Sequence, residues 1–244
     1  MKLRKRLTSF LIILVFLGAV FYARPLGIKR LIAKNYYQLQ AAILPLALNK
    51  EANVKLDVPF HKQERPLSCE IATLRMALNY YGLRVSENEL LAQLPSETSS
   101  SRRPGNIWGD PNEGFVGDIN GRMPNSGYGV YEKPIAEVAG NYREAQALNG
   151  TSLATILEHV AAGRPVVVWG HISSGKDISW TTPDGAPVKA IFGEHTKVIT
   201  GFIGTVSNPK YLVLLDPIYG KVIWSTDKFL QNWATLDNRA VVVY

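Results

Sequence analysis

The sequence predicts an α+β fold, because helical patterns come early in the chain and β-type runs come late. Apolar residues at helical spacing, Ile71, Leu74 and Leu78, indicate a helix from about Ser68 to Tyr81. The C-terminal third alternates apolar runs with turns, in the segments HTKVITGFIG, YLVLLDP, KVIWS and AVVVY. Helices followed by a series of strands are typical of an α+β domain with an antiparallel sheet.

The positive charge of the chain is confined to its N-terminal arm. The 244 residues carry a formal net charge of +7, yet residues 1–50 hold nine Lys or Arg and no acidic residue. Residues 51–244 are left with 18 basic and 20 acidic residues, a net charge of −2. A domain that binds nucleic acid is expected to present a basic face. The globular part therefore gives no sign of a nucleic-acid partner.

An uncharged stretch of 17 residues, Leu7–Ala23, follows the basic N-terminus. As a helix it would be about 25 Å long, at the short end of what spans a bilayer. A cleavable signal peptide begins in the same way but ends in small residues, whereas this stretch ends in AVFYA. We therefore expect an uncleaved transmembrane anchor at 1–23. A basic juxtamembrane stalk at 24–50 would lie in solvent or along the membrane surface.

Residues 51–244 are numerous enough to form one domain with its own core. Besides the helix at 68–81, we expect a β-type run at 54–60, a helix with a Ser86–Glu89 capping box, helices at 134–147 and 152–162, the buried strand RPVVVWG, and a short helix near 226–233. Basic residues flank the apolar stretch 7–23 on both sides, so the positive-inside rule does not orient the chain.

The segment 95–128 shows no periodicity and contains six Gly and four Pro. Loops of this length in a compact domain are usually functional or disordered, and the aromatic residues here favour an ordered loop. We predict that it forms one wall of a binding cleft, with Trp108, Gly127 and Tyr128 contacting substrate. Its acidic residues do not have the spacing of a calcium loop, so no metal is expected.

Cys69 is the only cysteine and falls in the first turn of the helix at 68–81. Free cysteines are often just buried apolar residues, although the positive end of a helix dipole favours a thiolate. A catalytic cysteine also needs a base and a group that orients the base.

Among the four histidines, His195 is the best placed to be that base. His195 opens the run HTKVITGFIG and Asp216 closes YLVLLDP, with the turn residues of TVSNPK between them. If the two runs pair as an antiparallel hairpin, the histidine and the carboxylate meet, and the carboxylate can fix the imidazole tautomer. His171 is a second candidate. The alternative is that His195 caps its strand and Asp216 begins a turn.

Gln63, six residues before the cysteine, could supply a side-chain amide to an oxyanion. Glu70 directly follows the cysteine, and a carboxylate beside a thiol opposes thiolate formation.

Four segments within residues 54–235 carry a resemblance to a known family: VPFHKQERPLSCEIATLRMALNYYG, DPNEGFVGDINGRMPNSGYGVY, HTKVITGF and LLDPIYGKVIWS. In order and spacing they resemble the papain-like cysteine peptidases related to the bacteriocin-processing peptidase, cysteine peptidase family thirty-nine, and most closely its stand-alone bacterial branch. The resemblance implies a papain-like fold in which the cysteine helix packs on the sheet. It implies Cys69 as nucleophile, His195 as base, Asp216 as orienting acid and Gln63 as oxyanion donor, without a cofactor.

The sequence therefore predicts a cysteine peptidase that is anchored in the cytoplasmic membrane, with its catalytic domain outside, and that acts on peptides or proteins. Two alternatives remain open. One is a peptidoglycan-directed amidase or transpeptidase with the same triad, and the other is an inactive papain-like domain that serves as a binding or scaffold module.

Overall fold

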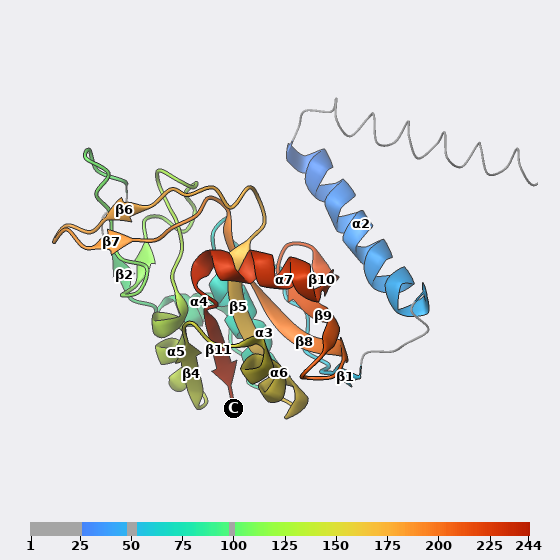
Figure 1. The fold of residues 1–244 in the computed structure, drawn as a ribbon. Helices are drawn as coiled ribbons and strands as arrows, with labels where there is room; N and C mark the ends of the chain where they lie inside the picture. The colour runs from blue at the N-terminus through green and yellow to red at the C-terminus, as the bar shows by residue number, and fades with distance from the viewer. Residues whose placement is uncertain (1–25, 48–52, 98–100) are drawn as a thin grey trace, which may run out of the picture.

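The computed structural model describes residues 26–47, 53–97 and 101–244 (Figure 1). The predicted anchor at 1–23 lies outside these residues. Within the described ranges, no helix is both long enough and apolar enough to cross a membrane.

A seven-stranded sheet forms the centre of the domain, in the order β10–β9–β8–β5–β11–β4, with β1 paired to β8. All of its pairs are antiparallel, so the predicted α+β class is confirmed. The strands are β1 Val54–Lys55, β4 Ala145–Leu148, β5 Val166–His171, β8 Glu194–Gly204, β9 Pro209–Asp216, β10 Gly220–Ser225 and β11 Ala240–Val243.

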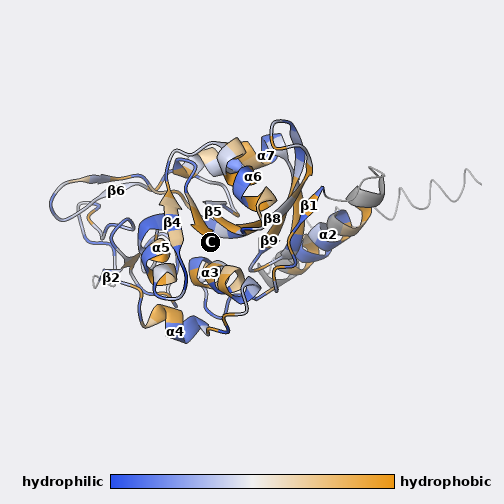
Figure 2. Cartoon of the chain, turned by 90° about the horizontal axis from the view of Figure 1, so that it is seen from below, coloured by the Kyte–Doolittle hydropathy of each residue, from blue (hydrophilic) through white to orange (hydrophobic). Residues whose placement is uncertain are grey.

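Helices cover both faces of the sheet (Figure 2). On one face pack α3 (Cys69–Tyr80), α4 (Glu87–Leu91) and α5 (Glu132–Gly140), and on the other α6 (Leu153–Ala161) and α7 (Thr226–Trp233). Strand β5 shows why its sequence is apolar throughout: Val167 and Trp169 enter the first core, while Val166 and Val168 enter the second. Side chains alternate along a strand, so a strand buried on both faces has no polar side.

The helix predicted at 68–81 is α3, and it ends before Gly82, which has φ +80°. The predicted capping box is present: Ser86 Oγ accepts from Glu89 N, and Glu89 Oε2 accepts from Ser86 N. The helix predicted at 134–147 is wrong in its second half. It ends at Gly140, and Ala145–Leu148 instead pairs with β11, because the sheet edge satisfies the backbone there.

The described residues of the segment 95–128 are mostly turns and bends with two short strands, β2 (Ser96–Glu97) and β3 (Phe115–Val116). They pack near the hairpin of β6 (Trp180–Thr181) and β7 (Pro187–Val188), where Ile107 bridges to Thr181. The rings of Trp108 and Trp180 lie 5.2 Å apart. A short 3-10 helix, Ala234–Leu236, precedes β11.

Most of the segment expected to be a stalk is a helix, α2 (Leu26–Ala47), which lies beside β10 (Figure 1). The ring of Tyr37 lies 5.4 Å from that of Tyr219, which joins β9 to β10. Tyr36, Leu39 and Ile43 remain exposed. At least one side of α2 is thus in contact with the domain.

Candidate active site

The hairpin of β8 and β9 brings His195 and Asp216 together, as the sequence predicted. His195 Nε2 lies 3.1 Å from Asp216 Oδ1, and both side chains are buried. An ionised carboxylate can only accept, so Nε2 carries the proton of this hydrogen bond. The imidazole therefore keeps Nδ1 available as a base.

The surroundings of Asp216 favour its ionised form. Burial by itself raises the pKa of this carboxyl, but the charge and hydrogen bond of His195, the charge of Lys197 and the backbone N–H of Ile218 together lower it to about 2. Asp216 Oδ1 also accepts from the N–H groups of Ile218 and Tyr219 at 2.8 and 3.1 Å. Asp216 is thus a fixed negative charge beside the imidazole.

Lys197 is a buried cation on the same face of the sheet. Its Nζ lies 3.7 Å from Asp216 Oδ2 and 4.7 Å from the centre of the Trp224 ring. The pKa of His195 is lowered, first by burial and further by Lys197, against the attraction of Asp216. These surroundings favour the neutral form of the His195 imidazole.

Cys69 begins α3 next to the start of β8. The hydroxyls of Thr73 and Thr196 lie 3.0 Å apart, which fixes the first turn of α3 against this strand. The backbone N–H of Thr196, the residue directly after His195, lies on the side of the sulfur and acts to lower the pKa of Cys69. The cysteine helix therefore packs on the sheet at the residues that the sequence singled out.

The thiol itself points to Glu70. Cys69 Sγ donates to Glu70 Oε2 at 3.2 Å, and Glu70 Oε1 accepts from Val130 N at 2.8 Å. Burial, followed by the charges of Glu70 and Glu194, raises the pKa of Cys69 well above its usual value. This outweighs the helix dipole, so the resting group is a thiol.

Alternation along β8 separates the two halves of the site. Thr196 faces α3, and Glu194 shares that face, whereas His195 and Lys197 point to the opposite face. Across the described part of the chain, no hydrogen bond joins Cys69 to His195. The predicted histidine–carboxylate pair is present, but the thiol is turned away from it.

Gln63 lies near Asp216, since its backbone N–H donates to the carbonyl oxygen of the next residue, Pro217, at 3.1 Å. Its side-chain amide donates to the carbonyls of Arg65 and Pro66, at 2.8 and 3.0 Å. The predicted oxyanion donor is therefore held by its own loop in this state.

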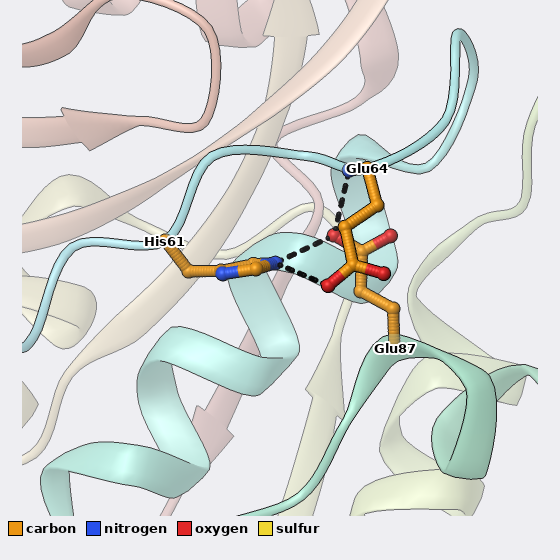
Figure 3. A group of neighbouring side chains, drawn as sticks. All are labelled: His61, Glu64 and Glu87. Atoms are coloured by element: carbon orange, nitrogen blue, oxygen red, sulfur yellow. Dashed lines mark hydrogen bonds and ion pairs between the residues drawn. The ribbon is translucent and has the colours of Figure 1, made fainter.

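A charged cluster ties the Gln63 loop to α4 (Figure 3). Glu87 Oε1 lies 2.8 Å from His61 Nε2 and accepts from the backbone N–H of Glu64 at 3.0 Å. Arg75 on α3 adds a positive charge, with Nη1 2.9 Å from both His61 Nε2 and Glu64 Oε1. We read this cluster as a structural brace for the loop.

The three residues predicted to contact substrate, Trp108, Gly127 and Tyr128, do not line an open cleft. Trp108 and Tyr128 are fully buried in the first core, so neither offers its side chain to a ligand in this structure. A Cβ at Gly127 would lie 2.2 Å from Asp118 O, which shows that this glycine permits a close approach of two loop segments. The aromatic residues of this loop predicted correctly that it is ordered, but they pack in the core of the domain and not along a substrate cleft.

A cavity of about 280 Å³ adjoins the carboxylate of Asp216. His171, the second histidine candidate, lines it together with Lys197, Asp216 and Trp224, and Tyr37 of α2 closes one side. His171 Nδ1 lies 2.9 Å from Ser173 O, so this histidine is tied to its own loop.

Sequence reasoning missed Glu194 and Lys197. Both are buried charged residues of β8, at 3% exposure each. Their position on either side of His195 in a strand flanked by apolar residues was the available signal, because charged residues are rarely buried without a partner.

The chain belongs to the Peptidase_C39 like family, whose sequence profile matches residues 55–241. The predicted resemblance is thereby confirmed. The uncharacterized protein YvpB of Bacillus subtilis (strain 168) is 29% identical over 263 residues, which cover 98% of this chain and 99% of that protein.

A solved structure agrees at the level of the fold. A Bacillus anthracis protein assigned to the C39-like peptidases matches with a TM-score of 0.67 and 28% identity, over 80% of this chain and 98% of that one. The peptidase domain of Streptococcus ComA, a bifunctional ABC transporter in a quorum-sensing pathway, matches with a TM-score of 0.46 and 15% identity, over 76% and 98% of the two chains.

Proposed function

We propose that this chain is a cysteine peptidase in which Cys69 attacks the carbonyl of a peptide bond, with His195 as base and Asp216 as the residue that orients it. One observation carries the proposal. The buried pair of His195 on β8 and Asp216 on β9 lies beside Thr196, whose hydroxyl is 3.0 Å from that of Thr73 in the first turn of the helix that carries the only thiol of the chain. Family membership supports the same chemistry.

The side chains of Cys69 and Gln63 must turn before the reaction, because the first is bonded to Glu70 and the second to its own loop. Cys69 Sγ leaves Glu70 Oε2 and passes its proton to His195 Nδ1, the nitrogen that Asp216 leaves available. The thiolate sulfur then bonds to the carbonyl carbon of the peptide, and the electron pair of the C=O double bond moves to its oxygen, which becomes an oxyanion. The Cys69 backbone N–H, which as a first-turn amide has no partner within the helix, would stabilise that oxyanion together with the Gln63 amide.

Release of the products follows from the same residues. The imidazolium of His195 donates its proton to the leaving amine, and the acyl group remains on sulfur. A water molecule then gives its proton to His195 and attacks the thioester, which frees the carboxylic acid and the thiol. In the proposal the substrate is a peptide or protein, and residues 1–23 anchor the enzyme with its domain outside the cytoplasmic membrane.

A second function is favoured by a specific observation, the bond from Cys69 to Glu70 in place of one to His195. A domain that stays in this state would bind peptides without cutting them.

Both readings are tested by incubating the full chain with a peptide library and sequencing the new N-termini by mass spectrometry. Cys69→Ala is the matched control. New termini that appear with the wild type and vanish with Cys69→Ala support the peptidase. Products that carry an added amine acceptor indicate a transpeptidase, and retained, uncut peptides indicate a binding module.

A further inference from the structure

Cys69, Glu70 and Glu194 place three potential metal ligands together beneath the surface. One donor atom from each lies within 4.8 Å of the other two. Their exposed fractions are 4%, 0% and 3%. Cys69 Sγ and Glu70 Oε2 are already 3.2 Å apart.

The carboxyl group of Glu194 is buried without the hydrogen bonds that would compensate its loss of contact with water. Over the residues that the structure describes, neither carboxylate oxygen of Glu194 has a hydrogen-bond partner. A buried carboxylate normally has a charged partner or ligates a metal. Lys197 interacts electrostatically with both Cys69 and Glu194, but it carries one positive charge, and it is also paired with Asp216 at 3.7 Å.

Glycine at position 129 keeps the space between the two carboxylates open. A Cβ there would lie 2.4 Å from Glu70 Oε1 and 2.7 Å from Glu194 Oε2. Both carboxylates therefore converge on the same small volume. The Val130 N–H holds Glu70 Oε1 at 2.8 Å, as hydrogen bonds from the surroundings orient ligating carboxylates in metal sites.

We propose that Cys69, Glu70 and Glu194 bind one Zn²⁺ ion, through a thiolate and two carboxylates. A thiolate selects zinc over magnesium or calcium, and three protein ligands with a water as the fourth are common for zinc. Bond lengths of about 2.0–2.3 Å put tetrahedral ligand atoms roughly 3.3–3.6 Å apart, so the carboxylates need to approach by at most about 1.5 Å.

Binding is balanced in charge and protons. Zn²⁺ replaces the proton of the Cys69 thiol and the protons that the two carboxyls carry, since burial raises the pKa of Glu194 well above its usual value and that of Glu70 to about 7, and all of these protons pass to solvent. The resulting centre has a net charge of −1, from one divalent cation and three anionic ligands, in place of −3 without the metal, and it lies close to the ammonium group that Lys197 shares with Asp216.

Zinc at this position inhibits the enzyme, because the sulfur that binds the metal cannot attack a carbonyl. This consequence rests on the proposed function, whereas the binding itself does not. The site would then make the peptidase reversibly inhibited by zinc.

The cluster of His61, Glu64 and Glu87 provides an internal control (Figure 3). It also has three donor atoms within 4.8 Å of one another, but the guanidinium of Arg75 already lies 2.9 Å from two of them. A fixed cation thus occupies the role that a metal would have, and we expect no binding there.

The test titrates the reduced full chain with Cd²⁺, which gives an ultraviolet charge-transfer band when it binds a thiolate, and displaces it with Zn²⁺. Native mass spectrometry reads the stoichiometry. We expect one ion per chain, affinity about 10-fold to 100-fold weaker in Glu194→Gln, and no change in Glu64→Gln. Zn²⁺ should also slow alkylation of Cys69 and raise the melting temperature of the wild type.

Absence of the band in the folded wild type would overturn the proposal, and so would equal affinity in Glu194→Gln and wild type. Near-ultraviolet circular dichroism verifies the fold of each variant. The wild-type titration decides the matter even if Glu194→Gln does not fold. None of these measurements uses peptide cleavage, so loss of the peptidase proposal and loss of the zinc proposal are distinguishable.

Discussion

Replacement of Asp216 by asparagine removes a charge and keeps the shape of the side chain. The pKa of Asp216 is about 2 in the folded chain, against an ordinary value of 3.8. A difference of this size corresponds to about 2 kcal/mol of stability at neutral pH. The folded-state pKa is lowered, so this stability is present above about pH 4 and is lost as the pH falls through about 2.

Urea unfolding at two pH values measures this effect. Asp216→Asn should lower the free energy of unfolding by about 2 kcal/mol at about pH 7, and the deficit should shrink by about 1 kcal/mol at about pH 3. Asp57→Asn is the matched control, because the Asp57 side chain is 90% exposed. An Asp216→Asn deficit that is the same at both pH values, or absent at neutral pH, would refute the reasoning.

Three further substitutions test buried contacts of the domain. Arg239→Met leaves Glu132, which lies 2.6 Å from the guanidinium, buried without its partner, so unfolding should become easier by about 3–5 kcal/mol; an unchanged urea midpoint contradicts this. Glu87→Gln weakens the bonds that hold the Gln63 loop and should cost about 1–3 kcal/mol, and a neutral result would show that the brace contributes nothing. Gly129→Ala puts a Cβ into the space of two carboxylates and should cost about 1–3 kcal/mol, with a stable variant as the contrary outcome.

The His195–Asp216 pair could be predicted because it depends on local topology. Two adjacent strands joined by a short turn bring the first residue of one to the last residue of the other, whatever the rest of the fold does. The register of β8 and β9 bears this out, although it shifts at a bulge after Ile199.

The direction of the Cys69 thiol could not be predicted in the same way. It depends on the position of the Glu70 carboxylate, which accepts from the thiol and is held by the backbone N–H of Val130, 60 positions away in sequence. It also depends on strand alternation, which places Thr196 and His195 on opposite faces of β8. Such contacts follow from tertiary packing, and no periodic pattern in the sequence reports them.

The aromatic residues of the 95–128 loop show a further limit. Trp108 and Tyr128 signalled an ordered loop correctly, but burial in a core and exposure in a cleft demand the same residue types. Similarly, the basic composition of residues 24–50 did not reveal that α2 would lie against Tyr219.

The central claim is that His195 activates Cys69, and alkylation of the single thiol tests it most directly. The full chain, in the presence of a chelator, is treated with iodoacetamide, and whole-protein mass spectrometry follows the modification of the wild type, His195→Ala and the control His159→Ala. The account predicts that His195→Ala reacts at least about tenfold more slowly than the wild type, while His159→Ala reacts at the wild-type rate. Equal rates in all three folded proteins would contradict the claim and favour the binding module.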